Sequence, residues 1–221
     1  MQYNRSQLIS LLSHQTETFY ARTLDISDCV EEVISAVDTS LSASQNKYNQ
    51  MEREFSPFNT CQYCMFLYVL SKVYASRGDT EKADIIYCLN KALHGVDLYH
   101  GIQLPKIWGM EHPLGSVMGR AVYGDRFFFY QGCTVGGSGG VYPHIGTDVI
   151  MYSNSKILGD AVIGNRVILS ANTYVIKRNI PDNSLVFGQG DHLTIKSISD
   201  ERFFQMCGHI WKYYGSSPTS V

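Results

Sequence analysis

The sequence predicts an α+β protein in which an N-terminal all-helical domain precedes a parallel β-helix and a short C-terminal helix. Glycine divides the chain, because only Gly78 and Gly95 of the 19 glycines precede residue 100. Apolar residues recur at helical spacing before that point, and large apolar residues recur every sixth position after it. We therefore expect a helical domain over 1–95, a β-helix over 96–196, and a C-terminal helix with a tail over 197–221.

The helical half is predicted to contain four helices with apolar stripes. The stripes are Leu8, Leu11 and Leu12, then Val30, Val33, Ile34 and Val37, and, in a third helix over 60–75, Tyr63, Phe66, Leu67 and Leu70. Asp28 is the expected cap of the second helix. Thr80 is the expected cap of the fourth helix, which should end near Leu93, before Gly95.

The second half shows a six-residue period. Its first positions are Val117, Tyr123, Phe129 and Val135, then Ile145, Met151, Ile157, Ile163, Leu169 and Val175. The phase shifts by four residues between the two runs, which predicts a loop inserted over 136–144. A period of six fits a parallel β-helix, in which three flat faces make one turn and each contributes an inward side chain. A sandwich of short strands is the alternative. The segment 199–214 is expected to form a helix that packs on the β-helix or on a neighbouring chain.

Composition excludes several classes of protein. Hydrophobic residues make up 44% of the chain and charged residues 17%, so disorder is not the dominant state. A net charge of −2 provides no basic field for nucleic acid or an anionic membrane. The most apolar run, 65–74, contains Lys72 and is about half of the roughly twenty residues that a bilayer span needs. The start MQYNRSQ shows no secretory signal, so we expect a cytoplasmic protein.

The cysteines are expected to be free thiols. Cys61 and Cys64 form the one CxxC pair and fall on one face of the third predicted helix, without two further ligands at matching spacing. No metal site is therefore expected. The six cysteines are Cys29, Cys61, Cys64, Cys88, Cys133 and Cys207.

The segments VMGRAVYGD, CTVGGSGG and ILGDAVIGN resemble the hexapeptide-repeat acyltransferases, whose coil is a left-handed β-helix. The combination VDLYHG…MEHPLGSVMG…TVGG after a helical domain is similar to serine O-acetyltransferases in particular. The resemblance covers about 95–190, and the helical part only in outline. It implies an acetyl-CoA-dependent O-acetyltransferase without a metal. It also implies a homotrimer with the site between subunits, which the helical domain could join into a dimer of trimers.

The resemblance implies that His112 is the general base and that Asp97 steadies its imidazole. The D-H-A-x-G turn of the family reads E-H-P-L-G over 111–115, and Asp97 stands fifteen residues before His112. An alcohol is a poor nucleophile at neutral pH, and a histidine can take its proton as it attacks. A carboxylate on the other ring nitrogen fixes the tautomer. A structural histidine at the domain junction is the alternative for His112.

The resemblance also implies residues for the donor, acetyl-CoA. Gly136 and Gly137 match the T-L-G-G of the family, where a missing side chain lets the donor approach. Ser153 and Ala171 stand where the family has small residues beside the cofactor. Lys177 could meet a CoA phosphate. The thioester is already activated, so neither a metal nor a covalent enzyme intermediate is required.

The acceptor site departs from the family. The R-H-P-K-I segment, whose basic residues hold the carboxylate of serine, reads V-Y-P-H-I over 141–145. A carboxylate clamp needs charge-assisted donors, and of these only His144, shifted by two, remains. Glu111 replaces the aspartate beside the histidine. We therefore expect Glu111, Tyr142 and His144 to line a site for a sugar or glycan hydroxyl, with Tyr130, Tyr142 and Tyr152 as stacking surfaces.

Three alternatives remain open. The first keeps the chemistry and uses L-serine as acceptor, giving O-acetyl-L-serine. The second is a metal hydratase of the carbonic-anhydrase type, which needs a close pair of histidines, whereas His100, His112 and His144 are far apart in sequence. The third is a non-catalytic β-helix scaffold, which loss of His112 or Asp97 would have favoured; both are present.

Overall fold

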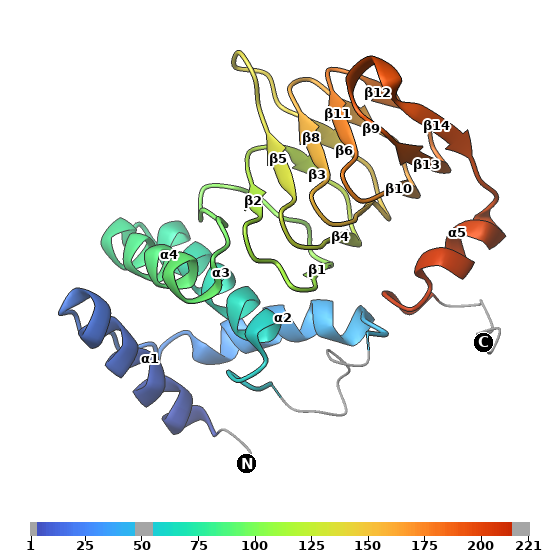
Figure 1. Cartoon of the computed structure of the whole chain (residues 1–221). Coiled ribbons are helices and arrows are strands. Elements are labelled where there is room, and N and C mark those ends of the chain that lie inside the picture. Colours follow the sequence, from blue (N-terminus) through green and yellow to red (C-terminus); the bar gives the residue numbers. More distant parts are fainter. Residues whose placement is uncertain (1–3, 47–54, 214–221) are drawn as a thin grey trace.

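The structure, a computed structural model, describes residues 4–46 and 55–213. As predicted, N-terminal helices lead into a left-handed parallel β-helix, and a short helix follows it (Figure 1). The part of the predicted tail beyond residue 213 lies outside the described residues. Within the described part of the chain, no helix is both long and apolar enough to cross a membrane.

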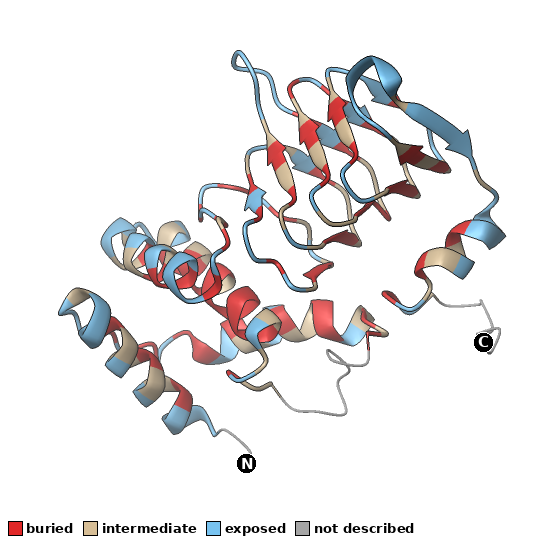
Figure 2. Ribbon diagram, in the orientation of Figure 1, coloured by how far each residue is buried: buried red, intermediate tan, exposed pale blue. Residues whose placement is uncertain are grey.

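Residues 4–46 and 55–94 contain four helices. They are α1 (Arg5–Tyr20), α2 (Val30–Ala43), α3 (Thr60–Ser76) and α4 (Thr80–His94). Figure 2 shows α3 as the most buried of them, packed between its neighbours. The apolar stripes predict these helices because burial of one face supplies most of a helix's stability in a protein.

Two helix caps differ from the sequence prediction. Asp79, not Thr80, caps α4 with its side chain. Asp28 does not cap α2, because its carboxylate accepts a hydrogen bond from Arg77 at 2.7 Å instead. Cys29 takes the N-cap position without a side-chain hydrogen bond. The local capping rule is wrong for Asp28 because its carboxylate bonds to Arg77, the residue that follows α3, instead of to the start of α2.

Three sheets form the faces of the β-helix in the described residues. The first face is β1 (Trp108–Met110), β4 (Phe127–Phe129), β7 (Ile150–Met151), β10 (Val167–Leu169), β13 (Ser184–Phe187) and β14 (Thr194–Ser197). The second face is β2 (Val117–Met118), β5 (Thr134–Gly136), β8 (Lys156–Leu158) and β11 (Tyr174–Ile176). The third face is β3 (Val122–Tyr123), β6 (His144–Ile145), β9 (Val162–Ile163) and β12 (Asn179–Ile180). Pairing is parallel throughout, except that β14 runs antiparallel to β13.

Inward side chains stack in register between successive coils. The columns are Met118, Val135, Ile157 and Val175; Tyr123, Ile145, Ile163 and Ile180; and Phe129, Met151, Leu169 and Val186, all buried. The sequence period is wrong at Val117, which is 40% exposed, because Met118 points inward instead. The inward residues Met118 and Tyr123 are five positions apart, whereas Ile157 and Ile163 are six positions apart, and a fixed period does not detect this difference.

Glycines after the inward residues allow the coils to approach closely. A Cβ at Gly124 would lie 2.5 Å from the carbonyl carbon of Gly146, and a Cβ at Gly146 would lie 2.7 Å from that of Gly164. These glycines therefore serve close packing between coils, because their φ angles are not left-handed. At this corner, between the third face and the first face, the residues with left-handed φ angles are Arg126, Asp148, Arg166 and Asn183.

The outer side of the first face is covered by the C-terminal segment. Phe128 and Ile168 point away from the β-helix interior and are buried against Phe203 and Trp211. The helix here, α5 (Asp200–Cys207), is shorter than the predicted 199–214. The chain turns after α5 so that the indole nitrogen of Trp211 donates to the Arg126 carbonyl at 3.2 Å. Of the two packing partners that the sequence left open for this segment, Trp211 therefore packs on the β-helix.

His94 is a buried histidine in the core of the helical part of the chain. The Nδ1 atom of His94 lies 2.7 Å from Oδ1 of Asn90, and its ring meets the edge of Tyr63. Burial lowers the pKa of His94 below its usual value of 6.5, although a hydrogen bond to Asn90 opposes the shift.

We expect acidification to destabilise the protein through His94. Its folded-state pKa is depressed, so the unfolded chain takes up a proton that the folded chain excludes as the pH falls below about 6.5. The free energy of unfolding should then fall more between about pH 7.5 and 5.5 in the wild type than in His94→Gln, which does not titrate. Urea unfolding at the two pH values measures this, and equal losses in both proteins would contradict it.

Candidate functional site

The predicted site residues lie at two corners of the β-helix, on either side of the second face. The first corner joins the first and second faces and comprises 111–116, 130–133, 152–155 and 170–173. The second corner joins the second and third faces and comprises 119–121, 137–143, 159–161 and 177–178. Glu111, His112, Ser153 and Ala171 belong to the first corner. Gly137, Tyr142 and Lys177 belong to the second, where Gly136 and His144 flank the inserted loop.

His112 presents its imidazole to solvent at the first corner. Its backbone is left-handed, with φ of 51°, and its side chain is 74% exposed. The turn is anchored by the Glu111 amide, which donates to the Phe129 carbonyl at 3.1 Å. Burial raises the pKa of the Cys61 thiol in α3, and a hydrogen bond with the His112 backbone opposes that shift. The helical part of the chain thus contacts the turn that carries His112.

The Glu111 carboxylate lies beside that imidazole. Its Oε1 is 3.7 Å from Nε2 of His112, and its Oε2 accepts a hydrogen bond from the Asn46 amide at 3.1 Å. The Glu111 side chain is only 20% exposed. Burial raises the pKa of Tyr130, and the charge of Glu111 adds to that increase. A half-buried carboxylate within ion-pair distance of His112 can stabilise the imidazolium within a single chain.

Asp97 is held by α4 rather than by His112. The Tyr87 hydroxyl donates to its Oδ1 at 2.9 Å, and the Lys91 ammonium donates to its Oδ2 at 2.6 Å. Its backbone bridges to Val117 at the start of the second face. Within the described residues, His112 and Asp97 share no hydrogen bond, so their predicted pairing stays a prediction.

The inserted loop is a short hairpin at the second corner. Ser138 and Val141 exchange backbone hydrogen bonds around Gly139 and Gly140, whose φ angles of 64° and 83° suit a tight two-residue turn. A Cβ on Gly137 would lie 2.6 Å from the Tyr142 ring. Within this chain, Gly137 therefore makes room for Tyr142, and its predicted role toward a donor stays a prediction.

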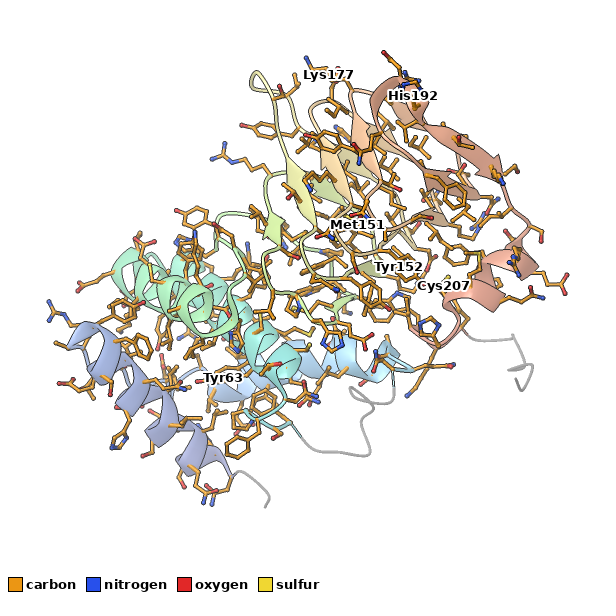
Figure 3. The ribbon with its side chains drawn as sticks, viewed as in Figure 1. Tyr63, Met151, Tyr152, Lys177, His192 and Cys207 are labelled. Atoms are coloured by element: carbon orange, nitrogen blue, oxygen red, sulfur yellow. The ribbon has the colours of Figure 1, made fainter. Side chains whose placement is uncertain are left out.

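The remaining residues predicted to bind acetyl-CoA are accessible, but they lie at two different corners. Ser153 is half-buried and Ala171 exposed at the first corner, whereas Lys177 is exposed at the second. Figure 3 shows Lys177 at the edge of the β-helix near the inserted loop, and Tyr152 toward α5. Tyr130 and Tyr152 stack on each other at 5.1 Å, so their rings pack together rather than offer two free faces.

Sequence reasoning missed Arg120. It lines an open cavity of about 640 Å³ over the third face, together with Tyr142 and His144. Its Nη1 donates to the Tyr142 hydroxyl at 3.3 Å, and its guanidinium carbon lies 5.7 Å from the centre of that ring. The sequence could have indicated Arg120 as a lone basic residue, because no other Lys or Arg occurs over 107–125. Across residues 4–46 and 55–213, no group of three or more His, Cys, Asp or Glu side chains is arranged to hold a metal ion.

No family model matches the sequence. A serine acetyltransferase of Staphylococcus epidermidis is 31% identical over 130 residues, which are 57% of this chain and 60% of that protein. A solved serine acetyltransferase in complex with cysteine matches with a TM-score of 0.73 and 18% identity, covering 93% of this chain and 85% of that one. Another, in complex with CoA, matches with a TM-score of 0.68 and 16% identity, covering 89% and 86%.

These comparisons confirm the resemblance to serine acetyltransferases and the left-handed β-helix fold. The match to the Staphylococcus epidermidis protein spans about 60% of its length. Neither comparison assigns a role to an individual residue of this chain.

Proposed function

We propose that the protein is an acetyl-CoA-dependent O-acetyltransferase and that its acceptor is L-serine. The observation that carries the proposal is the 31% identity to a serine acetyltransferase, joined to a matching fold over 93% of this chain. The proteins compared are serine acetyltransferases, which supports L-serine over the sugar or glycan hydroxyl that the sequence favours.

His112 is the proposed general base. Its exposed imidazole can take the proton of the acceptor hydroxyl as the oxygen becomes a nucleophile. A carboxylate must stabilise the imidazolium that forms, and Glu111 is in ion-pair distance to do so. Asp97 is the partner that the resemblance implies, and a rearranged side chain would have to leave Lys91 and Tyr87 to act in this way.

The outer side of the second face fits the donor, which supplies an acetyl group already activated as a thioester. The half-buried side chains of Leu158 and Ile176 lie in register with Gly136 there and form a narrow apolar strip. Exposed Lys177 follows that strip directly and forms no ion pair with a described residue. An apolar strip that ends at a cation suits the long arm of CoA, which has methylene segments along its length and phosphates at its nucleotide end. Gly136 and Lys177 are therefore proposed donor residues on this face, and Ser153 and Ala171, at the first corner, are the further donor residues that the resemblance implies.

The same proposal includes a homotrimer. His112 and the residues Tyr142 and His144 lie at different corners of one chain, so a single copy does not assemble them. A closed threefold arrangement would bring the first corner of one copy to the second corner of the next. Leu114, which is 66% exposed at the first corner, gives such an assembly apolar surface to bury. A dimer of trimers through the helices is compatible with it.

Thiol release from acetyl-CoA tests the activity. L-serine and a panel of sugars and glycans serve as acceptors, and His112→Ala is the blank for each. We expect serine-dependent release that is lost in the blank. Release with a glycan but not with serine would overturn the acceptor. No release with any acceptor, despite binding of CoA, would favour the non-catalytic scaffold.

A further inference from the structure

We propose that the cavity over the third face binds an α-amino acid, with Arg120 holding the carboxylate and Asp160 holding the ammonium. The proposal rests on the proposed function only in naming L-serine as that amino acid. Neither residue belongs to the site that the sequence predicts.

The register of the third face brings the two residues into one column. Val122, His144, Val162 and Asn179 pair side by side on successive coils. The residues two positions earlier therefore follow one another along the second corner, and they are Arg120, Tyr142, Asp160 and Lys177. Opposite charges thus stand two coils apart, with a tyrosine between them.

The spacing suits a zwitterion. Successive coils are about 4.8 Å apart, which puts the backbones of Arg120 and Asp160 about 10 Å apart along the axis. An α-amino acid that lies along the column over Tyr142 can therefore place its carboxylate toward Arg120, whose Nη1 already reaches the Tyr142 hydroxyl at 3.3 Å, and its ammonium toward Asp160. A sugar carries neither charge, so it would leave Arg120 and Asp160 without charge-assisted partners.

Both charges are available to a ligand. Asp160 forms no ion pair or side-chain hydrogen bond with any residue in the described part of the chain. Arg120 bonds to the Tyr142 hydroxyl through one of its five N–H groups, which leaves donors for a carboxylate. Tyr142 is itself seated against Gly137. Arg120 is therefore oriented by a neighbour without being neutralised.

The cavity provides the remaining features of a small-molecule site. Its volume of about 640 Å³ is ample for an amino acid. Val122, Val162 and Ile102 supply apolar lining, and Gln103 and His144 supply further polar groups. Apolar walls beside a charge pair strengthen charge-assisted hydrogen bonds by reducing the local dielectric constant.

Two measurements on the full chain test the proposal. One is equilibrium binding of L-serine without acetyl-CoA, by calorimetry, and the other is KM for L-serine in thiol release. Arg120→Gln and Asp160→Asn should each weaken binding and raise KM by about 10- to 100-fold, with kcat within about twofold of the wild type. Arg202→Gln is the matched control, because Arg202 is an exposed arginine of α5 that contacts Gln205. Circular dichroism checks that each variant is folded.

Ethanolamine, which lacks the carboxylate, separates charge recognition from a general defect. Its KM, or its affinity, should be the same in Arg120→Gln as in the wild type. Serine parameters that match those of Arg202→Gln in both cavity variants would overturn the proposal, as would a wild type that does not bind L-serine. Binding that depends on Arg120 without any turnover would support the cavity and overturn the proposed function. Turnover that does not depend on Arg120 would support the proposed function and overturn the assignment of the cavity.

Discussion

Replacing His112 with alanine is expected to lower kcat for serine acetylation by about 10²- to 10⁴-fold, the usual contribution of a general base. The imidazole is 74% exposed and contributes little packing, so the free energy of unfolding should stay near that of the wild type. Thiol release at saturating acetyl-CoA and serine measures the loss. His192→Ala is the matched control, because His192 is an exposed histidine at a turn of the last coil. Full activity in His112→Ala would remove His112 from the mechanism.

The same assay can distinguish the roles of the Glu111 and Asp97 carboxylates. Removing a carboxylate that stabilises the imidazolium formed during the reaction lowers kcat. From the geometry of one chain, we expect a larger loss of kcat in Glu111→Gln than in Asp97→Asn, because Oε1 of Glu111 lies 3.7 Å from Nε2 of His112. The opposite order would show that assembly or substrate frees Asp97 from Lys91 and brings it to His112.

Replacing Phe128 with alanine is expected to lower the free energy of unfolding by about 3–5 kcal/mol, the usual loss for a buried phenylalanine. Phe128 is fully buried on the outer side of the first face. Its ring meets that of Trp211 edge-on at 5.7 Å and that of Tyr130 at 5.3 Å. Truncation would leave a cavity between the β-helix and the C-terminal segment. Urea unfolding, followed by Trp fluorescence, measures the change.

Val122→Ala is the control for Phe128. Val122 also points outward from a strand of the β-helix, but it is 57% exposed in the single chain. Its truncation should change the free energy of unfolding of the isolated chain by less than about 0.5 kcal/mol. A loss of similar size in both variants would show that the C-terminal segment does not cover the first face in solution.

The β-helix could be predicted because each strand of a coil must point a large apolar side chain into the interior, so such residues recur at a regular spacing in the sequence. Ile145, Ile157 and Val175 satisfy that rule at multiples of six residues, and all three are buried. The rule is wrong at Val117 because the inward residues Met118 and Tyr123 are five positions apart instead of six, and the sequence period does not show this. Strand β14 was not predicted either, since its residues are all exposed and give no apolar alternation.

The candidate site was predicted only where its residues are local in sequence. Glu111 and His112 share one turn, so a motif identifies both. The side chain of Glu111 accepts a hydrogen bond from Asn46, which lies 65 positions away, beyond the end of α2, and no spacing in the sequence reveals that contact. Arg120 and Asp160 fall into one column only through the register of the coils, which requires the exact length of each corner.

Strand β14 determines how the β-helix ends. A parallel coil leaves a row of free N–H and C=O groups on its final turn, and such an edge can recruit a strand from another chain. On the first face, β14 folds back antiparallel to β13 over four residue pairs and occupies that edge with the chain's own backbone. Its own outer edge is short and carries Lys196, which discourages further pairing. This face of the coil is therefore protected against end-to-end polymerisation.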